Sequence, residues 1–217
     1  MDCSIIDLKK DIRIALDLNN VSTQLFDVSD IDTLTLEQII DSKIVDAVRL
    51  VESAAPYHLL DSGKIFPDGT DIEWESSAGF GAGRIPLPRD FMRLVAFRMS
   101  DWSRTVFSVV DVASPVYAMQ HSRFPGIRGN PQSPVVAIVD SPVGLALEFY
   151  CCYGGKGVHV EDARYLPMPV VSEDGKISVC EKLKSSVVYR AAALVANTIK
   201  DYEASQRVVV LSTELMN

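Results

Sequence analysis

Helical periodicity at both ends of the chain, with a different texture between them, is the feature that most limits how this sequence can fold. Apolar residues recur at helical spacing between a capping box at Thr35 and Gln38 and a stop at Pro56. From Glu181 the chain contains no glycine or proline. Such stretches form amphipathic or buried helices. We therefore expect helices from the two ends to pack together around or beside whatever the middle forms.

The N-terminal part predicts a pair of helices. Ile5, Leu8, Ile12 and Leu16 share one helical face, after a cap-like Ser4 with Asp7 three residues on, and Asn19-Asn20 is a plausible end. The polar stretch from Ser22 to Thr33 predicts a loop. The second helix has a wide apolar stripe made of Leu36, Ile39, Ile40, Ile44, Val45, Val48 and Val51.

The middle of the chain, from Asp61 to about Asp174, predicts β structure, because glycine and proline become frequent and the apolar runs become short. Asp174-Gly175 is a hairpin signal between Val170-Val171 and Ile177–Val179. The predicted strands are Ile72–Trp74, Phe91–Met99, Thr105–Val110, Val135–Val139 and Leu145–Tyr153.

The C-terminal part predicts a long helix. The run from Tyr189 to Ala196 is small and apolar nearly all round, which implies close packing against other helices. After Ser205 the chain either extends this helix or forms a docking strand. The predicted fold class is α+β, with an N-terminal helix pair and a long C-terminal helix packed together and a β-rich insert between them. We expect one composite domain with parts at 1–60, 61–180 and 181–217.

Composition narrows the class of protein. The 217 residues carry a net charge of −8, which disfavours tight wrapping of nucleic acid, because phosphate neutralisation by Lys and Arg dominates that affinity. No run of about 18 apolar residues is present, so we expect no membrane span. The N-terminus has early acids and no basic segment, which is untypical of a signal peptide. We expect a protein that is made and kept in a cytosol.

No catalytic motif stands out. The four cysteines, Cys3, Cys151, Cys152 and Cys180, are too sparse for a disulfide framework, and adjacent Cys151 and Cys152 predict small core residues. A nucleophilic pair of Cys152 with His121 or His159 stays open as an alternative. His58, His121 and His159 lack the spacing of metal ligands.

A glycine-rich stretch, Gly79–Arg84, is followed by Ile85-Pro86-Leu87-Pro88. A phosphate cradle needs a helix at that point, so a flexible loop is the better interpretation. The prediction is thus a protein that is not an enzyme, with no catalytic, cofactor-binding or metal residues.

Arginines supply the candidate contact residues. Arg89, Arg93, Arg98 and Arg104 form a local basic stretch, read either as edge-strand charges or as a contact with an acidic partner. The loop His121–Asn130 adds two more, and long loops often bind. The predicted partner or oligomer contacts are Arg89, Arg93, Arg104, Arg123, Arg128 and Tyr202.

Three segments together resemble the head–tail connector (adaptor or ring) proteins of tailed bacteriophages. They are the helix from Leu36 to Pro56, the stretch Ile85-Pro86-Leu87-Pro88-Arg89-Asp90-Phe91-Met92-Arg93-Leu94 followed by Trp102, and the alanine-rich segment Val188–Ala196. The resemblance implies a virion subunit that forms a ring of about twelve copies, binds the portal protein and meets the tail ring proteins. It implies no cofactor and no catalytic residue.

In such a ring, DNA would pass through the lumen without sequence-specific binding. About twelve copies would carry on the order of −100 charges, so an acidic lumen would repel DNA and let it slide. Two other classes stay open: a small ligand-binding or regulatory homodimeric module, and a cysteine-dependent hydrolase.

Overall fold

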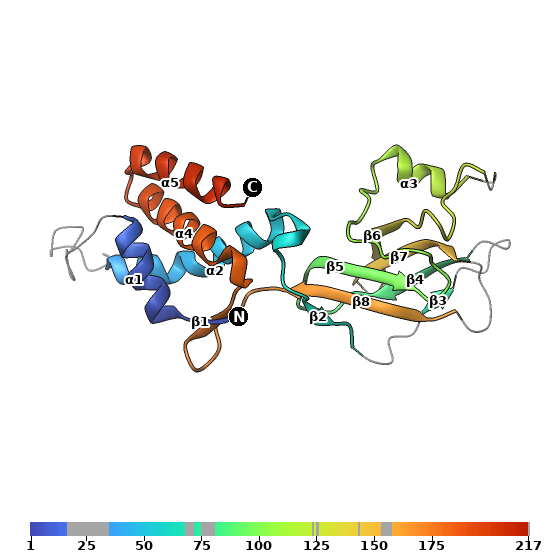
Figure 1. Cartoon of the computed structure of the whole chain (residues 1–217), viewed down its shortest axis with the longest axis horizontal. Coiled ribbons are helices and arrows are strands. Elements are labelled where there is room, and N and C mark those ends of the chain that lie inside the picture. The colour runs from blue at the N-terminus through green and yellow to red at the C-terminus, as the bar shows by residue number, and fades with distance from the viewer. Residues whose placement is uncertain are drawn as a thin grey trace. The chain divides into compact units, whose positions relative to one another are not determined.

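The computed structural model divides the chain into two compact units. It describes residues 1–16, 35–67, 72–74, 81–122, 124, 126–142, 144–152 and 158–216. The helical unit comprises Met1–Asp61 with Met168–Asn217, and the β unit comprises Ser62–Pro167 (Figure 1). The fold is α+β: one unit is built from both ends of the chain and the other from its middle.

Among the described residues, the helical unit holds four α-helices and two short 3₁₀ turns. The helices are α1 (Ile5–Ala15), α2 (Leu36–Ala54), α4 (Lys184–Thr198) and α5 (Tyr202–Glu214), and the turns are η1 (Tyr57–Leu59) and η2 (Glu181–Leu183). The predicted capping box of α2 is present, since the Gln38 N–H donates to Thr35 Oγ1 and the Thr35 N–H donates to Gln38 Oε1. The next residue after α2, Ala55, has an extended backbone before Pro56, as predicted.

The first helix is shorter than its predicted extent. α1 ends at Ala15, with Leu8 and Ile12 buried as predicted. Ser4 holds the N-cap position, but its side chain makes no capping hydrogen bond. The predicted end at Asn19-Asn20 and the predicted loop Ser22–Thr33 lie outside the described residues.

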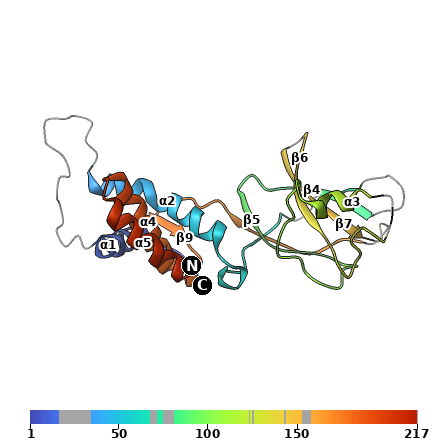
Figure 2. The same ribbon diagram turned by 90° about the horizontal axis from the view of Figure 1, so that it is seen from above.

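The helix α4 lies at the centre of the helical unit and contacts α1, α2 and α5 (Figure 2). Its buried residues, which include Val187, Ala191, Ala193 and Val195, lie on several sides of the helix. Small side chains let α5 approach closely, and Ser212 Oγ donates to the Ser186 carbonyl at 2.8 Å. The predicted close packing of this alanine-rich segment is confirmed.

The prediction of one long C-terminal helix is wrong, because the chain breaks between α4 and α5. Lys200 adopts the left-handed conformation with φ of 65°, the usual conformation of a residue just past a helix end. Asp201 then starts α5 by accepting a hydrogen bond from the Ala204 N–H at 3.0 Å. The segment after Ser205, left open between helix and strand, is helical through Glu214.

Replacing Lys200 with glycine is expected to stabilise the helical unit slightly, by about 0.5 kcal/mol. Glycine removes the cost of a side chain at positive φ, although it adds freedom to the unfolded chain. The control Lys200→Val should lose about 1 kcal/mol, because a β-branched side chain is strained there. Urea unfolding followed by circular dichroism at 222 nm measures both; equal stability of the two variants would contradict the assignment.

A two-stranded ribbon completes the helical unit, and the sequence did not predict it. β1 (Asp2–Ser4) pairs antiparallel with β9 (Lys176–Ser178). The predicted turn at Asp174-Gly175 is confirmed, with Gly175 at φ of 67°, but Val171 makes only an isolated bridge to Ile177. The segment 168–180, assigned above to the β-rich insert, belongs to the helical unit.

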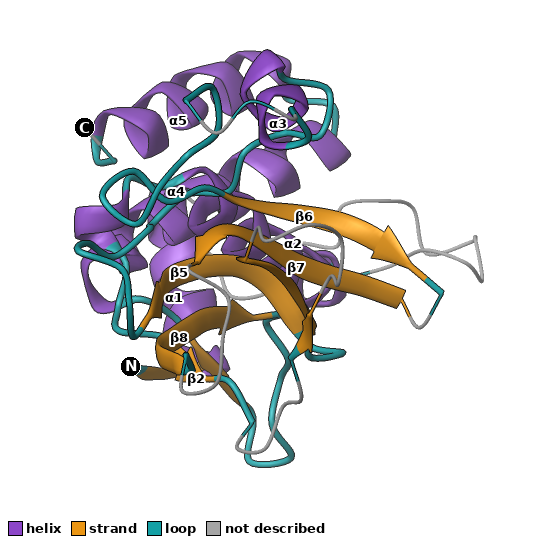
Figure 3. Ribbon diagram, turned by 90° about the vertical axis from the view of Figure 1, so that its right-hand side faces the viewer, coloured by secondary structure: helices purple, strands orange, loops and turns teal. Residues whose placement is uncertain are grey.

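Two antiparallel sheets form the β unit (Figure 3). One has the order β2-β8-β5 and the other the order β3-β4-β7-β6. The bounds are β2 (Lys64–Ile65), β3 (Glu73–Trp74), β4 (Gly81–Pro86), β5 (Phe91–Met99), β6 (Val136–Ser141), β7 (Gly144–Cys152) and β8 (Val160–Pro167), with the helix α3 (Pro115–Gln120) before β6. The predicted strand Phe91–Met99 is confirmed at both ends, and those at Ile72, Val135 and Leu145 differ by one residue at their starts.

Two predictions in the β unit are wrong. The stretch Thr105–Val110 is not a strand: Val106 bridges to β5 at Phe97 and Val110 bridges to β6 at Ala137, so the segment crosses from one sheet to the other. The glycine-rich stretch is a strand, β4, over its described residues. The strands β2, β4 and β8 were missed.

The core of the β unit lies between the two sheets. β5 and β8 contribute Phe97, Met99 and Tyr165, while β7 contributes Leu147 and Phe149. Gly83 of β4 lies against this core: a Cβ built there would meet Phe149 Cζ at 2.5 Å. The glycine of this stretch therefore makes room for an aromatic ring, and it serves packing where the sequence predicted flexibility.

Candidate interaction surfaces

The segment 104–133, which we call the α3 arm, covers the outer face of the four-stranded sheet. Ser114 caps α3 by accepting the Tyr117 N–H, and Pro115 occupies the first turn. Gln120 is buried and accepts the Gly129 N–H at 3.0 Å through Oε1. These bonds fold the loop after α3 back onto the helix.

A polar cluster attaches the arm to the sheet. Glu148 of β7 accepts a bond from Arg84 Nη2 at 3.1 Å and another from the Tyr117 hydroxyl at 3.2 Å. The Tyr150 hydroxyl lies 3.4 Å from His121 Nε2. The Glu148 side chain is 1% exposed and that of Arg84 is 45% exposed. The carboxylate is thus buried under α3, with its cation at the edge.

Burial, with Glu148 and Tyr117 close by, raises the pKa of the Tyr150 phenol. The hydroxyl therefore keeps its proton at neutral pH. The rings of Tyr117, His121 and Tyr150 also meet edge to face, with centroids 4.9–6.1 Å apart. Together these contacts fix α3 on the sheet, a structural role for the cluster.

The α3 arm exposes several apolar side chains. Val116 and Met119 lie on α3 away from the inward Tyr117 and Gln120. Exposed apolar side chains that gather in one stretch often mark an interaction site. The members that are 37–55% exposed are Phe107, Val109, Val112, Val116, Met119, Phe124 and Ile127.

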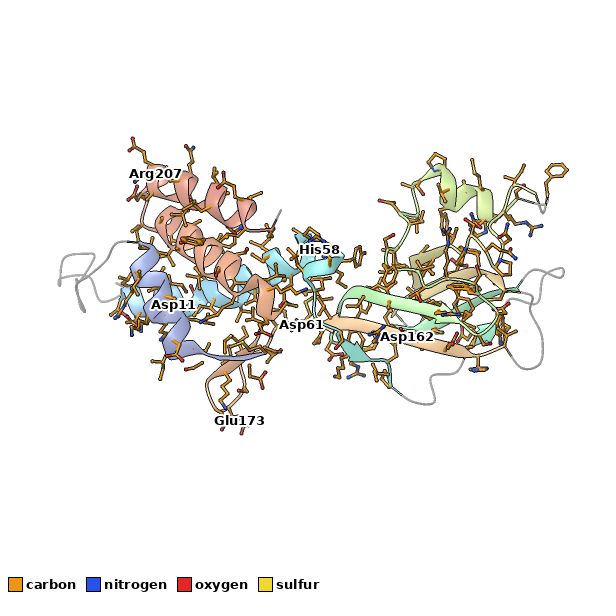
Figure 4. The ribbon with its side chains drawn as sticks, viewed as in Figure 1. Asp11, His58, Asp61, Asp162, Glu173 and Arg207 are labelled. Carbon is orange, nitrogen blue, oxygen red and sulfur yellow. The ribbon has the colours of Figure 1, made fainter. Side chains whose placement is uncertain are left out.

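A second surface with exposed apolar side chains lies on α5, where exposed charged residues lie among them. Val208 and Ser212 are its buried residues, so the helix touches α4 along a narrow stripe. Tyr202, Val210, Leu211 and Leu215 are exposed, Tyr202 at 59%. Arg207 projects from α5 on the side away from α4 (Figure 4). We call the exposed residues of 202–215 the α5 face.

A shallow groove of about 400 Å³ lies between α1 and α4. Ile14 and Ala15 line one side and Val188 and Tyr189 the other, and Lys184 Nζ pairs with Asp11 at 3.2 Å in it. Hydrogen bonding to Asp11 raises the pKa of Lys184. The groove is open and its charged pair is internally satisfied.

The structure separates the arginines predicted as contacts into two places. Arg89 and Arg93 lie at the start of β5, and Arg89 is exposed. Arg104 lies beyond the other end of that strand, which spans about 30 Å over its nine residues. They therefore do not form one basic patch.

Arg104 instead belongs to the α3 arm, where its Nη2 donates to Ser133 Oγ at 3.1 Å. Arg128 lies in the same arm, half-buried beside Gly129. Arg123 lies outside the described residues. Tyr202, the remaining predicted contact, is on the α5 face.

The Asp90-Phe91 pair of the connector-like stretch has a structural role in the β unit. Asp90 accepts bonds from the Tyr165 hydroxyl at 2.8 Å and from Lys64 at 2.9 Å. Burial opposes its ionisation, but these two bonds outweigh burial and lower the pKa of Asp90. Phe91 stacks on Tyr165. The pair thus joins the start of β5 to β8 and β2.

Two of the described cysteines, Cys152 and Cys180, have surroundings that favour the neutral thiol over the thiolate. Cys152 is buried in the core between the sheets, whereas His121 contacts Tyr150 on the outer face of the same sheet. Burial, with Glu52 adjacent, raises the pKa of Cys180 to about 12. An activated nucleophile has a lowered pKa. Cys152 and His121, the alternative nucleophilic pair, lie on opposite faces of the four-stranded sheet. The side chain of Cys151 is not among those described.

Glu52 is a buried acid beside Cys180, whose N–H donates to Glu52 Oε1 at 2.7 Å. Burial raises the pKa of Glu52, and the amide bond opposes this only in part. The native carboxyl thus binds its proton more tightly than the unfolded one. The stability that this proton contributes is present below about pH 4.5 and is lost as pH rises through the native pKa.

Replacing Glu52 with glutamine is expected to raise the free energy of unfolding by about 1 kcal/mol at pH 7, because glutamine keeps the acceptor and removes the buried charge. Near pH 4.5 the variant and the unmodified chain should differ little. Urea unfolding at both pH values, followed at 222 nm, measures this. An equal gain at both pH values would contradict a buried charge as the cause.

Neither a metal centre nor a bilayer span is found in the part of the chain that the structure describes. Within it, no three side chains of His, Cys, Asp or Glu converge as metal ligands do. None of its helices combines the length and the apolar run needed to cross a bilayer. Comparison of the sequence with protein-family models and with curated proteins found no match.

Proposed function

We propose that this chain is the ring-forming subunit of a phage head–tail connector, which binds the portal protein and continues the DNA channel toward the tail. The observation that carries the proposal is the pair of separate apolar surfaces, the α3 arm on the β unit and the α5 face on the helical unit. A closed ring needs two different, complementary binding surfaces on each copy, because its interfaces are heterologous. A two-fold dimer needs only one.

The segments behind the family resemblance are consistent with this role. Two of them, α2 and the alanine-rich part of α4, pack on each other inside the helical unit. The third begins β5, where Asp90 and Phe91 hold the β unit together. These segments supply a framework, and exposed apolar side chains lie outside it on the α3 arm and on α5.

The charge of the chain suits a DNA channel. The helical unit has 18 acidic and 11 basic residues, a net charge of −7, and the β unit has 11 acidic and 10 basic residues, a net charge of −1. A ring of such helical units repels DNA, so DNA passes without being held. The expected neighbours are the portal protein on one side and tail ring proteins on the other.

Quantitative mass spectrometry of purified virions from the phage that encodes this chain tests the proposal. A connector subunit should be present in a copy number equal to that of the portal protein, about twelve by the family resemblance. Absence from the particle, with abundance in infected cells, would overturn the virion role and indicate an assembly factor.

The alternative of a ligand-binding homodimer rests on the groove between α1 and α4. That groove is open and contains a closed ion pair between Asp11 and Lys184. A binding site for a small molecule is usually enclosed and mostly apolar, with unpaired polar groups that orient the ligand. The connector role is the better supported of the two.

A further inference from the structure

The two apolar surfaces carry opposite charge. In sequence, the α3 arm (104–133) contains three arginines and one aspartate, whereas the segment 201–215, which holds α5 and its cap, contains three acids and one arginine. On the arm, Arg104 is exposed and Arg128 half-buried. On α5, Glu203 and Glu214 are both exposed. The arm is thus the basic partner and the α5 face the acidic one.

We propose that the α3 arm of one copy docks on the α5 face of the next copy, and that this head-to-tail contact closes the ring. The inference rests on the proposed connector role and names the interface within it. Val116 and Met119 would meet Val210 and Leu211, and the exposed charged residues of α5 project between these two.

Charge disfavours the symmetric pairings. An arm against an arm would bring Arg104 and Arg128 toward their own copies, and two α5 faces would oppose Glu203 with Glu214. Like charges across an interface cost free energy, and unlike charges guide the correct partner. The unlike pairing uses two different patches of the same chain, which is the heterologous contact that generates rings.

Hydrogen bonds between described residues hold both surfaces in place. The arm is held by Gln120 on Gly129 and by Tyr117 on Glu148, and α5 is fixed along α4 through Ser205 and Ser212. α5 is about 20 Å long, from 13 residues. Because little chain must be ordered on docking, its cost is small.

A charge-exchange experiment tests the contact. Arg104→Glu with Arg128→Glu reverses the arm, and Glu203→Arg with Glu214→Arg reverses the α5 face. Each pair alone is expected to weaken assembly at least tenfold by mass photometry, and the four changes in one chain should restore it. Lys10→Glu and Glu173→Arg, at exposed sites outside both surfaces and outside the predicted contacts, are the matched controls.

Disulfide trapping gives a second readout that does not depend on charge. Met119→Cys and Val210→Cys are made in separate chains with tags of different size, mixed, and oxidised. The mixed dimer is expected, and neither variant should cross-link to itself. Circular dichroism confirms that each variant is folded.

The outcomes separate the two proposals. The contact is supported if each pair of charge reversals alone weakens ring assembly and the four changes together restore it. Unchanged rings in all variants, or self-cross-linking of either cysteine variant, overturn the contact and leave the connector role standing. Loss of portal binding with unchanged free rings makes the arm a portal contact and also overturns it. An unmodified chain that never assembles, alone or on the portal, overturns both.

Discussion

Gly83→Ala is expected to lower the free energy of unfolding of the β unit by about 2–3 kcal/mol. The added Cβ would lie 2.5 Å from Phe149 Cζ and 3.0 Å from Ile72 Cγ2. The Phe149 ring cannot retreat, because Phe97 and Trp102 pack against it at centroid distances of 5.4 and 6.4 Å. Overpacking a filled core typically costs about 1–3 kcal/mol.

Tryptophan fluorescence measures this effect selectively. Both tryptophans of the chain, Trp74 and Trp102, lie in the β unit, so urea unfolding followed by fluorescence reports on that unit. Gly126→Ala is the matched control, since a Cβ there meets nothing within 4 Å, and it should stay within about 0.5 kcal/mol. Equal stability of the two variants would show that Phe149 moves aside.

Arg84→Met is expected to lower the free energy of unfolding by about 3 kcal/mol, and Glu148→Gln by only about 1 kcal/mol. Losing Arg84 leaves the Glu148 carboxylate under α3 with the Tyr117 hydroxyl and no cation at 3.1 Å. Breaking a buried pair in this way costs about 3–5 kcal/mol, and the exposed edge of Arg84 reduces it. Glutamine leaves behind a half-exposed arginine, which water solvates.

The double variant Arg84→Met with Glu148→Gln provides the control. It removes both charges and should recover most of the loss, because no uncompensated buried carboxylate is left. Urea unfolding followed by tryptophan fluorescence compares the three variants. A loss in the double variant equal to the sum of the single losses would contradict the view that the uncompensated carboxylate is the cause.

Local signals predicted α2 and several strands well. Thr35 and Gln38 start α2, Pro56 follows its end, and the apolar run from Phe91 to Met99 gives β5 its bounds. Each signal acts within a few residues, and the structure follows it. The same holds for Gly175, whose positive φ closes the predicted turn.

Long-range packing explains the failures. The sequence suggested a loop at Gly83. The Phe149 ring, which leaves no room for a side chain at this position, is 66 residues away in sequence. β8 was missed because Asp162 and Arg164 hide its alternation, although they pair with each other at 2.6 Å on one face. The helix break at Lys200 has no glycine or proline, and only the cap at Asp201 signals it.

The candidate surfaces were predicted in part. The length and polarity of the loop His121–Asn130 indicated Arg128 as a contact residue, and Tyr202 was also among the predicted contacts. The apolar side of the arm was not predicted, because Phe107 and Val109 look like strand residues until the chain is seen to cross between sheets. The burial of Glu148 likewise depends on α3, which the sequence does not connect to β7.

Mass photometry of the purified chain, alone and mixed with the portal protein from the same genome, tests the central claim most directly, and negative-stain microscopy of the same samples shows the particle shape. The connector role predicts closed rings of the chain or a decorated portal, with a mass that fits a whole number of copies. A discrete dimer that ignores the portal would contradict it.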